Sequence, residues 1–285
     1  MATDENILEV RDLKVWFPIK KGIFSHTTGY VKAVDGVSFD LKRGETLGVV
    51  GESGCGKSTT SRAILGLNRP CGGVILFKGK VLRFGTKSSA ADYPELKGAD
   101  AVAMTPAEIA RKIQVVFQDP QAALNPRHTV MEILTEGMVY HGLCTKEERR
   151  AKAAELLESV GLPDTILDRY PHEFSGGQRQ RLCIARAIAL KPELLICDEA
   201  VSALDLSIRA QVLDLLAELK KKLGLTILFI THDLGVVQHV ADRIIVMNRG
   251  RIVESGPSAE VLGHPKEEYT KRLMAAVPVI GKPLA

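Results

Sequence analysis

Residues 51–58, Gly-Glu-Ser-Gly-Cys-Gly-Lys-Ser, decide the fold class, because glycines spaced in this way before lysine and serine are typical of a phosphate-binding loop. An apolar segment at residues 46–50 predicts a strand before the loop, and residues 57–67 predict a helix after it. In this setting backbone amides can surround a phosphate, and the helix start adds the positive end of its dipole. A glycine-rich turn that binds nothing is the alternative, but such a turn has no need of both flanking elements. The residues predicted to bind the nucleotide here are Gly51, Glu52, Ser53, Gly54, Cys55, Gly56, Lys57, Ser58 and Thr59.

Two side chains of this loop have a specific predicted task. Lys57 places a positive charge on the β- and γ-phosphates, and Ser58 offers its hydroxyl group to Mg²⁺. The loop therefore predicts a nucleoside triphosphatase, but it does not say of which kind.

Segments with strand and helix patterns alternate along the rest of the chain. Residues 7–17 and 30–41 alternate apolar and polar side chains, as two half-buried strands do, and residues 18–29 between them predict a loop. Residues 85–103 have no period and predict an exposed insertion. Further strands are predicted at residues 72–84 (with a turn at 78–80), 113–118, 194–197, 225–230 and 243–247, and further helices at 129–140, 145–160, 175–191 and 205–223. This alternation predicts an α/β fold with a mostly parallel sheet and helices on its faces.

The composition is that of an ordinary α/β protein and excludes several other classes. Of 285 residues, 45% are hydrophobic and 25% are charged, and the net charge of +4 is too small to predict a nucleic-acid partner. No apolar run approaches the roughly 20 residues that a membrane-spanning helix needs, so neither a span nor a secretory leader is predicted. The five cysteines are dispersed without a CxxC spacing. That pattern predicts a reducing compartment, no zinc site and no iron–sulfur cluster.

An apolar strand at residues 194–197 is followed by two acids. A buried strand has no structural use for charges at its tip unless they meet a cation or another partner. Asp198 is therefore predicted to hold Mg²⁺ through a water, and Glu199 to orient or deprotonate the water that attacks the γ-phosphate. An exposed strand end with incidental acids is the alternative. Cys197, inside the strand, is predicted to be a packed apolar residue.

The stretch at residues 174–178, Phe-Ser-Gly-Gly-Gln, precedes a long helix. Ser175 can cap this helix with Gln178 at the third helical position, and Gly176 and Gly177 permit close approach of the backbone. A bare helix start is an anion site, and because this one is separate from the phosphate loop, its phosphate could come from another molecule. A flexible turn is the alternative. The stretch resembles the LSGGQ signature of ABC ATPases, with Phe in the first position.

Other motifs of that family follow in the family's order, over about residues 7–255. Gln118 matches the Q-loop, Asp205 ends a match to the D-loop, and His232 matches the switch histidine. The resemblance implies a P-loop NTPase with a RecA-like core, an antiparallel β subdomain and an ABC-specific α-helical subdomain. It also implies that ATP and Mg²⁺ are bound, that Gln118 contacts the metal and links it to a permease, and that His232 contacts the γ-phosphate. Catalytic roles then fall to Glu199, His232 and Gln118, and Asp205 joins the nucleotide-binding residues.

Such cassettes pair head to tail, so the resemblance implies that ATP lies between one subunit's phosphate loop and the other's residues 175–178. It further implies an aromatic residue near the N-terminus that stacks on the adenine. Phe17, at the end of the first predicted strand, is the first candidate and Tyr30 the second, although either could belong to the core.

Two parts of the chain resemble the dipeptide and oligopeptide importer branch, which includes nickel and glutathione importers. They are residues 115–127 and the short motifs Gly-Pro, His-Pro, Tyr-Thr and Ala-Ala-Val-Pro within residues 256–278. The branch implies ATP hydrolysis that drives peptide import at the cytoplasmic face of the inner membrane. Its implied partners are permease subunits, an extracytoplasmic solute-binding protein and a second ATPase subunit, more often a related chain than a copy. The nucleotide-binding domain would span residues 1–255, with a helical subdomain at about 119–190, and residues 256–285 would form a C-terminal tail.

Three rival functions lack their own signals. An ABC protein of DNA repair or ribosome work would carry a long coiled coil or two cassettes. A regulatory cassette would lack Lys57, Glu199, His232 or the signature glycines, and a small-molecule kinase would not need the signature.

Overall fold

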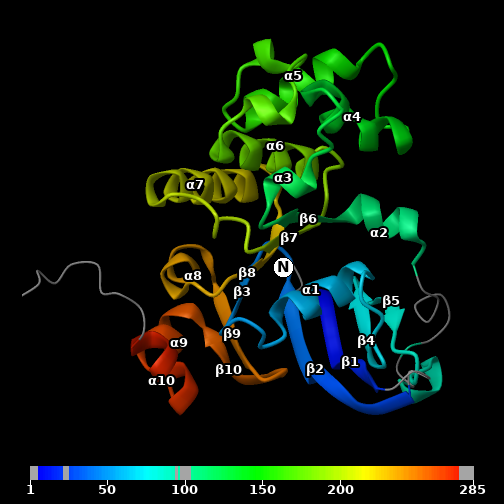
Figure 1. The fold of residues 1–285 in the computed structure, drawn as a ribbon, viewed down its shortest axis with the longest axis vertical. Helices are drawn as coiled ribbons and strands as arrows, with labels where there is room; N and C mark the ends of the chain where they lie inside the picture. Colours follow the sequence, from blue (N-terminus) through cyan, green and yellow to red (C-terminus); the bar gives the residue numbers. More distant parts are fainter. Residues whose placement is uncertain (1–5, 22–25, 94–95, 97–103, 276–285) are drawn as a thin grey trace, which may run out of the picture. The chain divides into compact units, whose positions relative to one another are not determined.

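The computed structural model describes residues 6–21, 26–93, 96 and 104–275 (Figure 1). The chain forms two compact units, one built from residues 1–104 and 229–285 and the other from residues 105–228. The phosphate loop and His232 belong to the first unit. The second unit contains Gln118, the two acids Asp198 and Glu199, and the signature at residues 175–178.

The first unit contains a four-stranded antiparallel sheet with the strand order β2-β1-β4-β5. Its strands are β1 (Asn6–Lys21), β2 (His26–Lys42), β4 (Gly72–Phe77) and β5 (Lys80–Phe84). The predicted turn between β4 and β5 is present, and both of its central residues, Lys78 and Gly79, have positive φ angles, 54° and 76°. Two positive φ angles match the right-handed twist of a tight hairpin, which is why a glycine stands here.

The prediction of a loop at residues 18–29 was wrong for most of its length. β1 continues to Lys21 and β2 begins at His26, with Ile19 paired to Gly29 and Lys20 to Thr27. Two antiparallel strands can satisfy each other's backbone groups while both faces stay in water, so this part of the hairpin needs no apolar alternation. Residues 22–25 lie outside the described part of the chain.

The first unit also contains strands in the order β10-β9-β3-β8. β3 (Thr46–Val50) is buried throughout and runs parallel to β9 (Arg243–Asn248), whereas β10 (Arg251–Pro257) is antiparallel to β9. β8 (Thr226–Ile230) is also buried, and the division between the units falls inside it. The helices of this unit are α1 (Lys57–Leu65), α8 (Leu234–Val240), α9 (Ser258–Gly263) and α10 (Glu268–Ala275).

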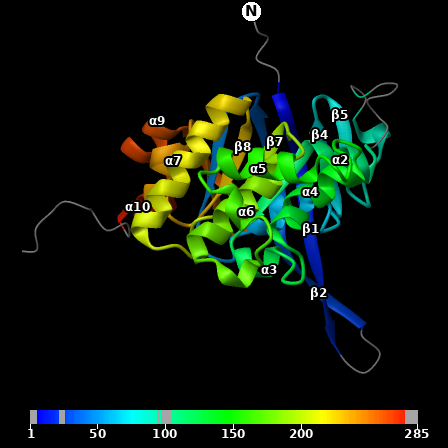
Figure 2. The same ribbon diagram turned by 90° about the horizontal axis from the view of Figure 1, so that it is seen from above.

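The second unit consists of two parallel strands and a helical part. β6 (Ile113–Phe117) pairs in parallel with β7 (Leu194–Asp198), and the helices α4, α5 and α6 pack on one another (Figure 2). The helices are α2 (Pro106–Lys112), α3 (Pro120–Ala123), α4 (Val130–Tyr140), α5 (Arg149–Ser159), α6 (Gly176–Ile188) and α7 (Leu206–Leu223), with short 3-10 turns η3 (Asp164–Ile166) and η4 (Pro171–Glu173).

Helix boundaries follow the capping residues more closely than the apolar period. α2 begins with a capping box, in which the side chain of Thr105 accepts the amide of Glu108 and the side chain of Glu108 accepts the amide of Thr105. α1 ends at Leu65, two residues before the predicted end, because Gly66 takes a left-handed conformation with φ 79°. α6 ends at Ile188, three residues early, since the residue before Pro192 is disfavoured in a helix.

The prediction that residues 85–103 form an exposed insertion was wrong for part of that segment. A 3-10 turn, η1 (Ala90–Asp92), leads to Tyr93, whose ring stacks on Phe84 with 6.2 Å between centroids. Tyr93 and Leu96 pack against the buried cluster that contains Val74 and Val81. Two isolated apolar side chains produce no periodic signal, so the sequence did not reveal this contact. Residues 94–95 and 97–103 lie outside the described part of the chain.

The capping box of α4 makes the stability of the second unit depend on pH. The carboxylate of Glu132 accepts the backbone amide of Thr129 at 2.8 Å, and this hydrogen bond lowers the pKa of Glu132 below its ordinary value of 4.5. A carboxyl group with a lowered pKa stabilises the fold above its unfolded pKa and loses that contribution as the pH falls through its folded pKa. Glu132→Gln keeps an acceptor oxygen and removes the charge. We expect it to lower the free energy of unfolding at pH 7 by about 0.3–1 kcal/mol.

Urea unfolding from pH 7 down to about pH 3.5 would measure this difference, which should shrink below pH 4.5. The matched control is Glu158→Gln on α5, where the side chain is exposed. A stability difference for Glu132→Gln that stayed constant over the whole pH range would contradict the role of the charge.

Candidate functional site

The phosphate loop turns sharply where β3 ends, and three of its residues must be glycine. Gly51 has φ 151°, and a Cβ atom there would lie 2.2 Å from the carbonyl oxygen of Met247. Gly54 has φ 82°. Gly56 has φ 110°, and a Cβ atom there would lie 2.3 Å from the carbonyl oxygen of Ala33. Side chains at these positions would be strained or would collide with backbone. The glycines of the motif therefore have a geometric cause in this chain.

Lys57 is the first residue of α1, and its side chain lies inside this loop. It is 4% exposed, and its ammonium group donates to the carbonyl oxygens of Gly51 at 2.7 Å and Glu52 at 2.9 Å. A buried ammonium group needs such partners, because transfer out of water without them costs several kcal/mol. The start of α1 has no side-chain cap, since its N-cap is Gly56. The loop thus combines a buried cation with uncapped amides, which is the donor set for a phosphate group.

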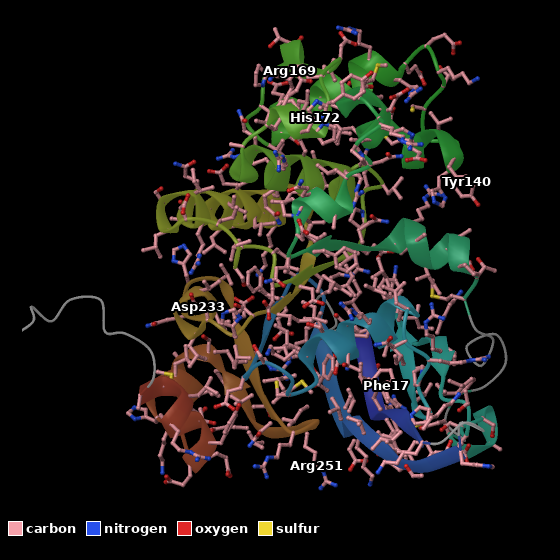
Figure 3. The ribbon with its side chains drawn as sticks, viewed as in Figure 1. Phe17, Tyr140, Arg169, His172, Asp233 and Arg251 are labelled. Atoms are coloured by element: carbon pink, nitrogen blue, oxygen red, sulfur yellow. The ribbon has the colours of Figure 1, made fainter. Side chains whose placement is uncertain are left out.

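His232 follows β8 in the same unit. The amide of Thr231 donates to the carbonyl oxygen of Val49 at 3.1 Å, so β8 and β3 lie side by side where both strands end. The residue after His232, Asp233, accepts the amides of Gly235 and Val236 and caps α8 (Figure 3). The structure therefore places His232 and the phosphate loop at the same edge of this sheet.

Gln118, Asp198 and Glu199 lie together in the second unit. Phe117 of β6 is the register partner of Asp198 of β7, so Gln118 and Glu199 each follow directly after a paired residue. Asp198 is 5% exposed at the end of a strand whose other residues are fully buried. Glu199 has φ 53°, a conformation that costs a non-glycine residue free energy and is found at functional sites. Burial raises the pKa of Cys197 to about 12, so its thiol stays protonated in the core.

The signature segment forms the capped start of α6. The hydroxyl of Ser175 accepts the amide of Gln178 at 3.3 Å, and the side-chain oxygen of Gln178 accepts the amide of Ser175 at 3.0 Å. A Cβ atom on Gly177 would lie 2.5 Å from Cγ2 of Ile208, whereas one on Gly176 would meet its nearest neighbour only at 4.0 Å. The start of α6 thus packs against the first turn of α7, which follows its N-cap Asp205.

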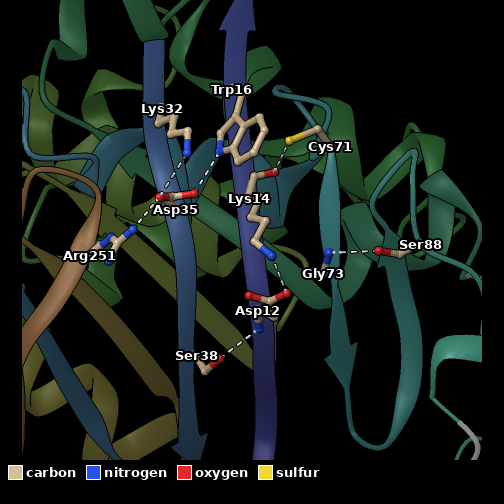
Figure 4. Close-up of polar contacts among 10 residues, drawn as sticks. All are labelled: Asp12, Lys14, Trp16, Lys32, Asp35, Ser38, Cys71, Gly73, Ser88 and Arg251. Carbon is tan, nitrogen blue, oxygen red and sulfur yellow. Dashed lines mark hydrogen bonds and ion pairs between the residues drawn. The ribbon is translucent and has the colours of Figure 1, made fainter. Parts of the chain in front are cut away.

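The two aromatic candidates for adenine stacking lie on opposite faces of β1 and β2. Phe17 follows Leu13 and Val15 on the buried face of β1 and is 41% exposed at the end of that row (Figure 3). Tyr30 packs on Trp16 with 6.1 Å between ring centroids, on the other face of these strands, and the indole N–H of Trp16 donates to Asp35 of β2 at 3.2 Å (Figure 4). The buried face is the one that continues into the core of the unit, so the packing favours Phe17 as the candidate. Its role stays a prediction.

Two residues that shape the candidate site carry no signal in the sequence. Ile208 closes the space beside Gly177, and the hydroxyl of Tyr269 contacts the backbone of Glu52 in the phosphate loop at 3.1 Å. Neither contact has a local signal, because each joins positions far apart in the chain. In the sequence Tyr269 stood out only as part of a Tyr-Thr pair in the tail.

A family profile described as "ABC transporter" matches residues 34–202, more than half of the chain. The chain belongs to the ABC transporter family. The oligopeptide transport ATP-binding protein AppF of Bacillus subtilis is 50% identical over 281 residues, which are 99% of this chain and 81% of that protein. The glutathione import ATP-binding protein GsiA of Pectobacterium atrosepticum is 48% identical over 278 residues, which cover 98% of this chain but only 42% of GsiA.

Among solved structures, the ATP-binding cassette MJ0796, in a dimeric post-hydrolysis state bound to ADP and Pi, is 26% identical with a TM-score of 0.70. The match covers 88% of this chain and 98% of that one. The predicted family, the P-loop NTPase fold, the ABC-type ATPase activity and the binding of ATP are confirmed by these comparisons. Within the described residues, no helix of this ABC transporter protein is long and apolar enough to cross a membrane.

The contact between Gly177 and Ile208 predicts that the two signature glycines differ in tolerance. Gly177→Ala should lower the free energy of unfolding by about 1–3 kcal/mol, because the new Cβ overlaps the β-branched side chain of Ile208, whose χ1 rotation is restricted in a helix. Gly176→Ala, which meets open space, should be neutral or slightly stabilising, since alanine favours the helix. Urea unfolding of the full chain would compare the two variants.

Ile208→Ala removes the overlapping methyl group and should restore stability in the Gly177→Ala background. Equal destabilisation by Gly176→Ala and Gly177→Ala would show that the packing of Ile208 is not the cause.

Proposed function

We propose that this chain is the ATP-hydrolysing subunit of an importer of dipeptides or oligopeptides. The observation that carries the proposal is the glycine loop that closes around the buried ammonium group of Lys57, in a chain half identical to AppF over almost its whole length. Import of glutathione or nickel by the same ATPase is the second candidate, and the similarity to GsiA favours glutathione. A non-transport ABC ATPase is the third and least supported.

In this proposal the amides of residues 51–59 and the Lys57 ammonium hold the phosphates of ATP. The donor set of Ser58, Gln118 and Asp198 consists of oxygen ligands, the kind that Mg²⁺ prefers, and would hold that ion, which neutralises phosphate charge when bound. Glu199 orients or deprotonates the attacking water, and His232 contacts the γ-phosphate. Phe17 stacks on the adenine.

The signature residues 175–178 are proposed to act on the nucleotide of a second cassette. A helix start stabilises an anion only within about one turn of its end, so the start of α6 needs the phosphate of a partner that docks against it. Asp205 belongs to the same arrangement. The dimeric state described for MJ0796 supports a cassette pair, and we propose a related chain as the partner more often than a second copy.

The remaining partners follow from the importer branch. We propose integral-membrane permease subunits, which Gln118 links to the metal site, and an extracytoplasmic solute-binding protein that selects the solute. The chain would then sit on the cytoplasmic face of the inner membrane as a peripheral subunit, with residues 256–285 as the branch's C-terminal tail. No iron–sulfur cluster and no nucleic-acid partner are proposed.

Two substitutions test the proposed chemistry separately. Lys57→Ala should abolish hydrolysis chiefly by weakening ATP binding, because Lys57 pairs phosphate charge already present in the ground state. Glu199→Gln should retain ATP and stop its cleavage, because Glu199 acts only on the attacking water. ATP affinity by calorimetry and single-turnover hydrolysis in the reconstituted transporter, with the partner cassette blocked, would separate the two effects.

Wild-type turnover in the Glu199→Gln transporter would remove Glu199 from the mechanism. Glu158→Gln, which changes an exposed acid of α5 in the same way, is the matched control and should leave turnover unchanged. Uptake of labelled peptide against labelled glutathione by the same transporter would decide between the first two candidates.

The proposed pairing predicts that Gly177→Asp disables the partner's nucleotide site. The variant is made together with Ile208→Ala, which removes the methyl group that a Cβ at position 177 would overlap, and Ile208→Ala alone is the reference. The new carboxylate would face the partner's γ-phosphate, while this chain's own loop should still bind ATP. Crosslinking of a labelled nucleotide to each chain of a heterodimer would report the two sites separately. Loss of the label from this chain alone would refute the head-to-tail arrangement.

A further inference from the structure

A tyrosine of the C-terminal segment contacts the phosphate loop. Tyr269 lies on α10, 217 positions after Glu52, and its hydroxyl oxygen accepts the backbone amide of Glu52 at 3.1 Å. The residue is 9% exposed and packs in a buried cluster with Val50, the last residue of β3, and with Leu234 of α8. Because the ring is held by this cluster, the hydroxyl group has a fixed position beside the loop.

The same peptide unit is bound from its other end by Lys57 of the phosphate loop. The carbonyl group of Gly51 and the amide of Glu52 belong to one planar peptide. The ammonium group of Lys57 donates to that carbonyl oxygen at 2.7 Å, and Tyr269 accepts from the N–H of the same plane. A rotation of the plane would break both hydrogen bonds, so the orientation of this one peptide links the tyrosine to the lysine.

This peptide plane has little intrinsic rigidity. Gly51 has φ 151°, a region in which glycine meets no Cβ barrier, and a side chain is excluded by the carbonyl oxygen of Met247. The plane that follows such a residue is free to rotate unless its own polar groups are held. The orientation of this peptide plane therefore depends on its hydrogen bonds, whereas at other residues steric contacts with the side chain restrict it.

The segment that carries Tyr269 is itself tied to the sheet. The carboxylate of Glu254, on β10, accepts the amides of Lys266 at 2.9 Å and Glu267 at 3.2 Å, just before α10 begins. Burial raises the pKa of Tyr269, so its hydroxyl group stays protonated at neutral pH and its oxygen remains an uncharged acceptor. The tyrosine is thus anchored at the start of its helix and around its ring.

We propose that Tyr269 is a positioning residue of the phosphate loop, whose hydroxyl group fixes the Gly51–Glu52 peptide and, through its carbonyl oxygen, the ammonium group of Lys57. The proposal rests on the proposed role of Lys57 in holding phosphate. It gives the segment that carries Tyr269 a part in nucleotide binding that acts through the backbone of the phosphate loop.

Tyr269→Phe tests this proposal, because it removes one oxygen atom and keeps the ring in its cluster. Loss of one hydrogen bond of ordinary strength should weaken the affinity of the full-length chain for ATP about 3- to 10-fold. KM for ATP in the assembled transporter should rise by the same factor, with kcat within about twofold of wild type. The Glu52 amide should exchange with deuterium faster, while the melting temperature without nucleotide stays close to that of wild type.

The matched control is Tyr140→Phe, the same chemical change at a side chain that is 78% exposed, and it should alter none of these quantities. Wild-type ATP affinity and wild-type exchange at Glu52 in Tyr269→Phe would overturn the proposal. So would a lower melting temperature with unchanged ATP affinity, since a purely structural role predicts that result. Lys57→Ala reports the proposed function independently: if it bound ATP like wild type, the role of Lys57 would fail, whatever Tyr269→Phe showed.

Discussion

The backward turn of the chain at Gly51 is the constraint on which the first unit depends. β3 is buried along its whole length, and the next residue passes so close to the backbone of Met247 that no side chain fits. The turn brings the carbonyl oxygens of Gly51 and Glu52 around the ammonium group of Lys57. These carbonyl groups carry no net charge, so they hold the ammonium group in place without compensating it as a carboxylate would, and an anionic phosphate is a strong partner for it. The glycines and the lysine therefore act together. The backbone geometry that glycine permits supplies the hydrogen-bond acceptors without which the ammonium group could not be buried.

Both units place their candidate site residues where buried strands of the sheet end. The interiors of β3, β7 and β8 are apolar or small because both faces are covered, so polar side chains are excluded until the strand reaches its edge. The hydrogen bond from Thr231 to Val49 aligns two such ends in the first unit, and the pairing of Phe117 with Asp198 aligns two in the second. The backbone of Glu199 is strained, with a positive φ angle, directly after the end of β7. A turn that begins at a rigid strand can hold such a conformation, which an unrestrained chain would rarely adopt.

The sequence predicted the elements that depend on local signals and failed where the cause is tertiary. Glycine spacing, capping residues and buried apolar runs identified β3, α1, α7 and the start of α6 almost to the residue. The long β1–β2 hairpin was missed because its outer part buries no side chains and therefore has no pattern. The contact of Tyr93 with Phe84 was missed because isolated apolar side chains have no period, and that of Ile208 with Gly177 because it joins segments distant in sequence. The roles of the candidate site residues rest on motif order, which reports chemistry but not the residues packed behind it.

Tyr269 shows why such supporting residues escape sequence analysis. Its hydroxyl group binds a backbone amide, and every residue except proline offers that group, so the partner's identity leaves no trace in the sequence. What makes tyrosine specific at this position is its ring, which packs in a buried cluster beside β3 and so brings the hydroxyl oxygen to the loop. A phosphate site built from backbone amides is sensitive to the orientation of single peptide planes, and those planes can be held from outside by any element that reaches them. In this chain that element is the helix nearest the C-terminal end of the described residues, so the phosphate loop and the C-terminal segment of this chain meet at one peptide bond.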